Sequence, residues 1–271
     1  MTGSLESPPF RQTSLRWTDP ALNKVPAVTL AFWVIKIFAT TIGETGADYL
    51  AFKMGLGLVG TAAVMTFVLI GALMLQVRAK DHRPGLYWLT VVLLSVVGTL
   101  LTDILTDRFG VSLFVSTAIF ATLLGATFGV WFLREDTVSI HSIDTRRREL
   151  FYWSAILFTF ALGTGAGDLV AEKLQWGYGL SALVFGSMIM AAAVAYYVFD
   201  VSFDLVFWSA YVMTRPFGAS IGDLLSQPTG NGGLGFGAER VSAVFLAVIL
   251  GLVILLAVRR RGTPSARARV S

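Results

Sequence analysis

The chain has 271 residues, of which 55% are hydrophobic and 14% are charged, and its mean hydropathy is +0.71. Because soluble domains carry about 25% charged residues, this composition excludes a soluble globular protein and predicts an integral membrane protein. The net charge of +4 resides mainly in short segments between apolar runs, so we expect no nucleic-acid partner. The chain has no cysteine, which excludes disulfides and Cys-ligated metals.

Eight apolar runs of membrane-spanning length predict eight transmembrane helices. A polar tail, residues 1–25, precedes them and lacks the apolar core of a signal peptide, and a basic tail, residues 259–271, follows them. Between the tails we expect a single all-α, polytopic membrane domain, residues 26–258. The eight runs lie near residues 26–50, 56–76, 85–106, 109–133, 150–172, 177–199, 205–226 and 239–258.

The distribution of Lys and Arg predicts the orientation of these helices. Most of the 21 basic residues lie in the two tails or in loops on the same side of the membrane as the tails. The opposite loops carry only Lys53, Arg108, Lys173 and Arg240. By the positive-inside rule, both termini are expected to be cytoplasmic.

Four tryptophans, four glycines and four aspartates recur with the same spacing. Each glycine follows its tryptophan by ten residues, and each aspartate follows it by 15. The three sets are Trp33, Trp88, Trp153 and Trp208; Gly43, Gly98, Gly163 and Gly218; and Asp48, Asp103, Asp168 and Asp223. The chain therefore contains four two-helix repeats, near residues 26–80, 81–134, 146–200 and 201–258. Since each repeat crosses the membrane twice, all four are parallel, and the four carboxylates are expected to form a ring around an axis along the membrane normal.

Further polar residues lie one helical turn from the aspartates, on the same helix face. These are Glu44, Thr99, Thr164, Asp107 and Glu172. Fifteen residues of helix rise about 22 Å against a hydrocarbon core of about 30 Å, which places the ring in the outer half of the membrane. Lipid would penalise these charges, so the face must contact protein or water. Two hypotheses stay open: the carboxylates bind a cation or a proton, or they hold the repeats together through hydrogen bonds between helices.

Two basic residues, Lys36 and Arg215, lie inside predicted spans and need internal partners. Arg215 follows Trp208 by seven residues, which places its guanidinium about 10 Å along the helix and too deep to reach the surface easily. Glu44 is the expected counter-ion of Arg215, because both charges depart from the repeat pattern. We expect a carboxylate of the helix face that carries the aspartates to pair with Lys36 as well. We interpret the four tryptophans as anchors at the membrane interface, with rings that plug the cytoplasmic mouth of a pathway as the alternative. We interpret the four glycines as sites of close helix packing, with hinges as the alternative.

The repeated unit, with tryptophans at 33, 88, 153 and 208, resembles a bacterial family of uncharacterised membrane-anchored proteins. That family is built from tandem two-span repeats, each with a characteristic tryptophan. The resemblance covers residues 26–258. It implies a location in the bacterial inner membrane, and it implies no activity.

The residues favour a transporter or channel for a small cation, or a proton-coupled process. Carboxylate and hydroxyl oxygens suit hard ions of the Mn²⁺, Mg²⁺ and Ca²⁺ class, whereas the lack of cysteine and of histidine within the spans disfavours Zn²⁺ and Cu⁺. The alternative is a non-transporting membrane scaffold or sensor. A membrane-embedded metal-dependent enzyme is the weakest hypothesis, because no histidine lies near the helix face that carries the aspartates. We therefore expect no enzymatic activity. The expected partners are membrane lipids and the cation. No cofactor is required, although the site could hold a divalent cation.

Overall fold

The computed structural model describes residues 24–79 and 82–261, and within these ranges the regular structure is helical. The remaining parts of the two expected tails, residues 1–23 and 262–271, lie outside the described residues. Eight long α-helices occupy the eight predicted ranges within this part of the chain. They are α1 (Leu30–Asp48), α2 (Gly57–Arg78), α3 (Pro84–Asp103), α4 (Leu113–Glu135), α5 (Arg146–Asp168), α6 (Gly177–Phe199), α7 (Phe203–Ser226) and α8 (Ala238–Arg261).

Short helical turns connect several of these helices. Three π-helices, η1 (Tyr49–Lys53), η2 (Ile104–Arg108) and η4 (Leu169–Lys173), continue α1, α3 and α5, and two 3-10 helices, η3 (Ile140–Ser142) and η5 (Thr229–Asn231), lie in loops. Hydroxyl side chains at the start of a helix accept a hydrogen bond from an otherwise unpaired backbone N–H. Thr29, Ser112 and Thr145 cap α1, α4 and α5 in this way. The turn before α2 contains glycines with positive φ, at 73° for Gly55 and 66° for Gly57, a conformation that glycine adopts without steric cost.

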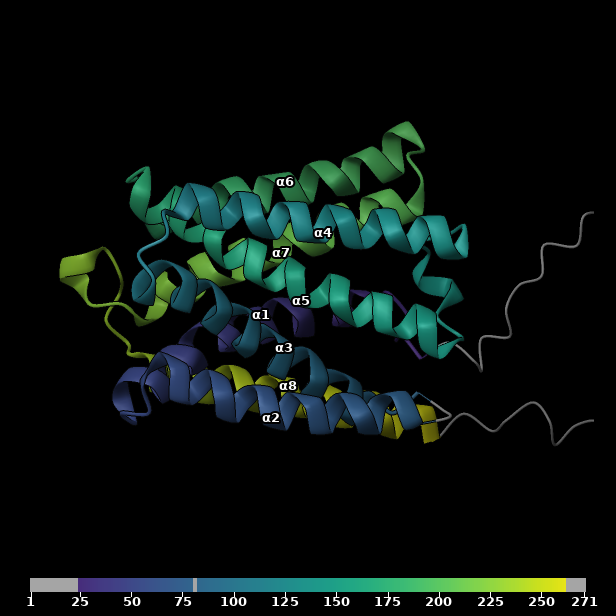
Figure 1. The fold of residues 1–271 in the computed structure, drawn as a ribbon, viewed down its shortest axis with the longest axis horizontal. Helices are drawn as coiled ribbons and strands as arrows, with labels where there is room; N and C mark the ends of the chain where they lie inside the picture. Colours follow the sequence, from purple (N-terminus) through teal and green to yellow (C-terminus); the bar gives the residue numbers. More distant parts are fainter. Residues whose placement is uncertain (1–23, 80–81, 262–271) are drawn as a thin grey trace, which may run out of the picture.

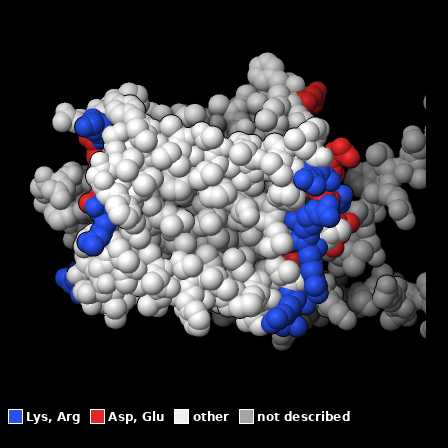
Figure 2. All heavy atoms as spheres, in the orientation of Figure 1, with Lys and Arg blue, Asp and Glu red and all other residues white. Residues whose placement is uncertain are grey.

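Six helical segments of the described chain are long and apolar enough to cross a membrane. They are Gly57–Arg78, Pro84–Arg108, Leu113–Glu135, Arg146–Lys173, Gly177–Phe199 and Ala238–Val258. The other two helices, α1 and α7, carry charges along their length, including Lys36 and Glu44 in α1 and Arg215 in α7, and these lower their hydropathy. On the face drawn in Figure 2, a wide belt without Lys, Arg, Asp or Glu separates two ends where charged side chains gather. These features indicate a membrane protein.

The helices form an inner ring and an outer layer (Figure 1). In the inner ring, α1 and α5 each pack against both α3 and α7. Outside the ring, α2 packs on α3, α4 on α5, α6 on α7, and α8 on α1. The buried share of the most apolar stretch is 61% in α3 and 56% in α5, but only 11–22% in the four outer helices. The outer helices therefore present apolar surface outward, where lipid would contact it.

The described chain begins and ends at the same end of the bundle, which we call the terminal end; the π-helical turns lie at the opposite, distal end (Figure 1). Three of the four repeat tryptophans, Trp88, Trp153 and Trp208, are buried near the terminal end, with exposed fractions of 2–5%. Trp88 contacts the ring of Phe32, and Trp208 contacts the ring of Trp131. The interpretation of these tryptophans as interfacial anchors is therefore wrong, because aromatic side chains from neighbouring helices enclose them within the protein.

The four repeat glycines lie where neighbouring inner helices approach closely. Each one faces the residue that stands seven positions after the tryptophan of the next inner helix. Gly43 faces Ser95, Gly98 faces Phe160, Gly163 faces Arg215, and Gly218 faces Thr40. A Cβ atom at position 98 would lie only 2.6 Å from the Cβ of Phe160, so a larger residue would push the helices apart. The prediction that these glycines permit close packing is confirmed.

Candidate functional site

The inner helices present a face whose residues are spaced four apart, from the residue before each tryptophan to each aspartate. From the terminal end to the distal end, its successive layers are Phe32, Tyr87, Tyr152 and Phe207; Lys36, Val91, Ile156 and Tyr211; Thr40, Ser95, Phe160 and Arg215; Glu44, Thr99, Thr164 and Ala219; and Asp48, Asp103, Asp168 and Asp223. Every side chain in the first four layers is buried. The four helices therefore turn this face toward one another, around a line that we call the axis.

A cavity of about 380 Å³ lies at the distal end of the axis, and we call it the vestibule. Its lining includes all four repeat aspartates and three further carboxylates predicted from the sequence. These seven are Glu44, Asp48, Asp103, Asp107, Asp168, Glu172 and Asp223. Thr106, which the sequence analysis did not single out, also lines it and donates a hydrogen bond to Asp107 at 2.9 Å. One polar compartment thus collects most of the residues predicted to bind a cation.

Exposure changes in order along the vestibule. Asp107 and Glu172 are exposed, and three of the four repeat aspartates are half-buried. Glu44 and Asp223 are buried, with 7% of each residue exposed. The cavity therefore opens at the distal end and closes toward the middle of the bundle.

Three carboxylates at the closed part of the vestibule come close enough to share one ion. One oxygen each from Glu44, Asp168 and Asp223 lie within 4.8 Å of one another. Two oxygens that each lie about 2.4 Å from a single ion are at most about 4.8 Å apart. This donor set, oxygen only and anionic, fits a hard divalent cation.

A π-helical turn begins immediately after each half-buried aspartate. The turns η1, η2 and η4 start at the residues that follow Asp48, Asp103 and Asp168. Single π-turns within α-helices are frequent at functional sites. The fourth aspartate, Asp223, lacks one: α7 continues as an α-helix and leads into a glycine-containing loop, residues 227–237. The fourth repeat thus departs from the other three at the mouth of the vestibule.

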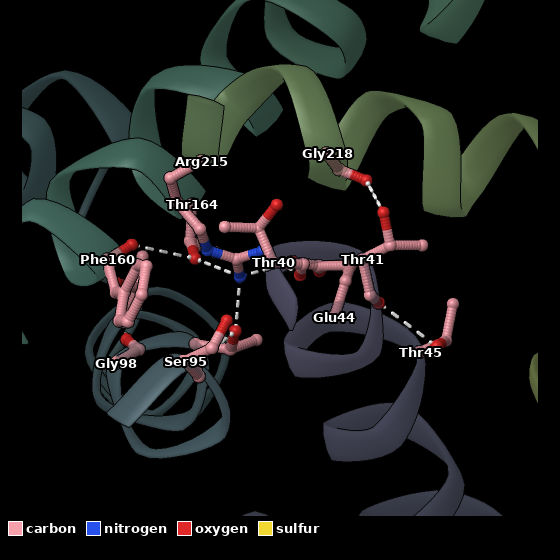
Figure 3. A network of polar contacts seen from close by, with 12 residues as sticks. Thr40, Thr41, Glu44, Thr45, Ser95, Gly98, Phe160, Thr164, Arg215 and Gly218 are labelled. Atoms are coloured by element: carbon pink, nitrogen blue, oxygen red, sulfur yellow. Dashed lines mark hydrogen bonds and ion pairs between the residues drawn. The ribbon is translucent and has the colours of Figure 1, made fainter. Parts of the chain in front are cut away.

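Arg215 contacts Glu44, which lines the buried part of the vestibule, and lies at the centre of a network of polar contacts (Figure 3). Its side chain is fully buried, and its guanidinium lies 2.6 Å from a Glu44 carboxylate oxygen. It also donates to the backbone oxygen of Thr40 at 2.7 Å and to the hydroxyl of Thr164 at 2.7 Å, and it contacts the hydroxyl of Thr99. The structure therefore contains the predicted pair of Arg215 and Glu44. It brings Thr99 and Thr164 to the guanidinium as acceptors.

Lys36 does not pair with a carboxylate in the described structure. Its Nζ is buried and lies 4.0 Å from the centre of the Phe160 ring and 4.1 Å from that of Tyr211. Among the described residues it has no hydrogen-bond partner. The expected ion pair is replaced by contact with two aromatic faces, which attract a cation through their quadrupole.

The sequence analysis missed a second buried ion pair, at the terminal end. Lys24 lies 2.6 Å from Glu149, whose exposed fraction is 1%, and also donates to the backbone oxygen of Val77 at 3.1 Å. This contact joins the segment before α1 to the end of α2 and the start of α5. Glu149 lies three residues, or about one helical turn, before Tyr152 of the inner face, and this position is the signal that could have revealed the pair.

The segment GASIG, residues 218–222, matches the spacing of a GxSxG nucleophile motif. That motif requires a sharp turn between a strand and a helix. Ser220 instead lies buried inside α7, so the local structure does not form a nucleophile elbow.

The fold and the vestibule define a helical membrane protein in which four sequence repeats surround one acidic compartment. The chain belongs to the family described as Repeat of Unknown Function (DUF347), with matches at residues 31–82, 86–137, 151–202 and 206–262. The matched segments agree with the predicted repeats, which confirms four tandem repeats. Comparisons with curated proteins and with solved structures gave no match.

Proposed function

We propose that the protein transports a small hard divalent cation, of the Mn²⁺, Mg²⁺ or Ca²⁺ class, across a bacterial inner membrane. In this proposal all eight helices cross the bilayer as four parallel two-helix repeats, and both termini are cytoplasmic. The observation that carries it is the vestibule, in which seven carboxylates line a single cavity at one end of the helix axis.

The charge of the vestibule favours a cation over an anionic substrate. Among the described residues, the ion pair to a vestibule carboxylate comes from Arg215, whose guanidinium is paired with Glu44. A cleft lined by one sign of charge concentrates ions of opposite sign. Carboxylate oxygens prefer hard divalent ions, and the triad of Glu44, Asp168 and Asp223 supplies three of the six to eight oxygens that an ion such as Ca²⁺ requires.

The contacts below the vestibule favour a carrier over an open channel. Arg215 fills the axis where an ion would leave the triad, and the four close glycine contacts hold the helices together in the same region. An ion at the triad would compete with Arg215 for Glu44. We therefore propose that ion binding weakens the contact between Arg215 and Glu44, and that its release lets the inner helices separate on the terminal side.

Vesicle flux tests this proposal. Purified full-length protein is reconstituted into vesicles that contain a fluorescent Mn²⁺ indicator, and MnCl₂, with MgCl₂ or CaCl₂ as competitors, is added outside. We expect Mn²⁺ entry above that of protein-free vesicles and strong loss of entry in the variant Asp168→Asn/Asp223→Asn. Glu239→Gln is the matched control, because Glu239 is an exposed acid at the distal end that does not line the vestibule.

Correctly inserted protein that moves none of the three ions would contradict transport. That result would leave the non-transporting scaffold or sensor as the better account of the fold. Equal flux in the wild type and in Asp168→Asn/Asp223→Asn would show transport by a route other than the vestibule.

A further inference from the structure

Lys36 is a buried cation on the axis that the cation site does not use. It lies one layer closer to the terminal end than Arg215. The equivalent positions in the other three repeats are Val91, Ile156 and Tyr211, so the lysine is an addition to one repeat. A charged residue in a membrane span, fully buried and without a hydrogen-bond partner among the described residues, is by default a candidate for function.

The groups that surround Lys36 are aromatic, hydroxylic or basic. From α7, Arg215 and Tyr211 face it, and from α5 the ring of Phe160 does so. One layer toward the terminal end, the titratable groups are Tyr87 on α3 and Tyr152 on α5, whose hydroxyls are 2.5 Å apart. From α8, which also packs on α1, the acidic and basic residues lie only near the ends of the helix. The described neighbours of Lys36 thus include no carboxylate that would hold its proton in place.

The two buried cations on the axis differ in what they can do with a proton. Arginine keeps its charge under all conditions that proteins experience, whereas a lysine ammonium can release a proton and become a neutral amine. Arg215 has four oxygen acceptors, while Lys36 has only aromatic faces. Of these two side chains, Lys36 is therefore the one that can change its charge.

We infer that Lys36 is a proton-carrying site that couples the movement of a divalent cation to the movement of a proton in the opposite direction. This inference rests on the proposed transport function and adds an exchange mechanism to it. The coupling is electrostatic. Lys36 precedes Glu44 by two helical turns, about 12 Å of rise, with Arg215 between them, so a divalent ion at the triad brings further positive charge close to the ammonium.

Release of the proton is a simple acid–base step. An N–H bond of the Lys36 ammonium breaks, the electron pair stays on nitrogen, and the proton passes to water that carries it out through the vestibule. The hydroxyl of Tyr211 and that of Thr159 are buried without partners among the described residues, and the paired hydroxyls of Tyr87 and Tyr152 lie on the terminal side. These groups mark the terminal side as the side from which a proton reaches Lys36 after the cation has left, so that the proton and the cation cross the membrane in opposite directions.

Parallel measurements of Mn²⁺ and protons test this inference. Vesicles with the full-length protein contain either an Mn²⁺ indicator or the pH dye pyranine, and valinomycin with K⁺ clamps the membrane potential. After MnCl₂ is added outside, we expect the wild type to show Mn²⁺ entry together with a rise in internal pH. In Lys36→Met and in Lys36→Arg we expect Mn²⁺ entry with the pH change reduced to that of protein-free vesicles.

Two variants are used because they fail differently. Lys36→Arg retains the buried charge and its aromatic contacts but cannot release a proton, so it remains informative if Lys36→Met does not fold. Lys173→Met is the matched control, because Lys173 is an exposed lysine at the distal end, and it should behave as the wild type.

The outcomes separate the two proposals. A rise in internal pH that persists in Lys36→Met or Lys36→Arg overturns the role of Lys36. Mn²⁺ entry into wild-type vesicles without any pH change overturns proton coupling and leaves the transport function intact. Absence of Mn²⁺ entry overturns the exchange of Mn²⁺ for a proton, and absence of Mn²⁺, Mg²⁺ and Ca²⁺ movement together overturns the transport function.

Discussion

The stability lost when Glu44 alone is removed and the stability lost when Arg215 alone is removed should sum to more than the loss when both are removed. The guanidinium is fully buried, and 9% of the Glu44 side chain is exposed, so both groups have lost most of their hydration. Truncation of one partner of a buried pair typically costs about 3–5 kcal/mol, because the other charge is left uncompensated. At about 2–4 °C per kcal/mol for a chain of this size, the melting temperature should fall by roughly 6–20 °C.

The contacts of Arg215 predict an asymmetry between the two single variants. In Glu44→Gln, Arg215 keeps three neutral acceptors, the Thr40 carbonyl and the hydroxyls of Thr99 and Thr164, so the loss should be near the lower limit. In Arg215→Met, the Glu44 carboxylate faces the other carboxylates of the vestibule without compensation, so the loss should be larger. The double variant Glu44→Gln/Arg215→Met should melt above Arg215→Met alone.

Thermal unfolding of the purified protein in detergent, for the wild type, both single variants and the double variant, gives the coupling energy. The control cycle uses Arg147 and Glu135, which lie 3.4 Å apart with 68% of the Arg147 side chain exposed. Such a pair should contribute less than about 1 kcal/mol. If the losses in Glu44→Gln and Arg215→Met simply add in the double variant, the two groups do not compensate each other and the reasoning is wrong.

Three further predictions concern packing, the terminal ion pair and orientation. Gly98→Ala should lower stability by about 1–3 kcal/mol in the same thermal assay, because the new methyl group overlaps Phe160. The control Gly71→Ala should not lower stability, because the space around Gly71 is open. Equal effects of the two substitutions would contradict the close contact. Lys24→Met should lower the free energy of unfolding by about 3 kcal/mol, because Glu149 stays buried without its cation. A loss no larger than that of Lys53→Met, an exposed control, would refute the stabilising role of this ion pair. The native chain has no cysteine, so single cysteines can report orientation. Gly230→Cys at the distal end should react with a membrane-impermeant maleimide on intact cells, and Arg146→Cys at the terminal end should not. The reverse pattern would place the termini outside.

The repeat spacing predicted the inner face of the bundle because its period is a property of the helix itself. Residues four apart lie on one side, so the four-residue step from Thr99 to Asp103, and from Glu44 to Asp48, was enough to identify the face that the aspartates share. The pair of Arg215 and Glu44 followed from the same register, since both charges depart from the pattern on that face. The repeat spacing did not predict which outer helix packs on which inner helix. An outer helix can pack on the inner helix of its own repeat or on the next one, and the loop lengths alone do not decide between them.

Other features depend on neighbours that no local pattern reveals. Tryptophan suits both a membrane interface and an aromatic core, and Trp208 lies in the core because Trp131 and Tyr152 come from other helices. A π-turn differs from an α-turn by one residue and has no composition of its own, so η1 could not be expected from the residues after Asp48. Lys36 lacks a carboxylate for a similar reason: the rings that contact its ammonium belong to Phe160 and Tyr211, which are distant in sequence.

The location of a bound ion tests the central claim most directly. Anomalous scattering from crystals of the full-length protein grown with MnCl₂ would show where Mn²⁺ binds. We expect a peak about 2.2–2.6 Å from oxygens of Glu44, Asp168 and Asp223, with Arg215 withdrawn from Glu44, and no such peak in Asp168→Asn/Asp223→Asn. A vestibule without a peak at saturating Mn²⁺, or peaks confined to the exposed carboxylates at the distal surface, would contradict the account.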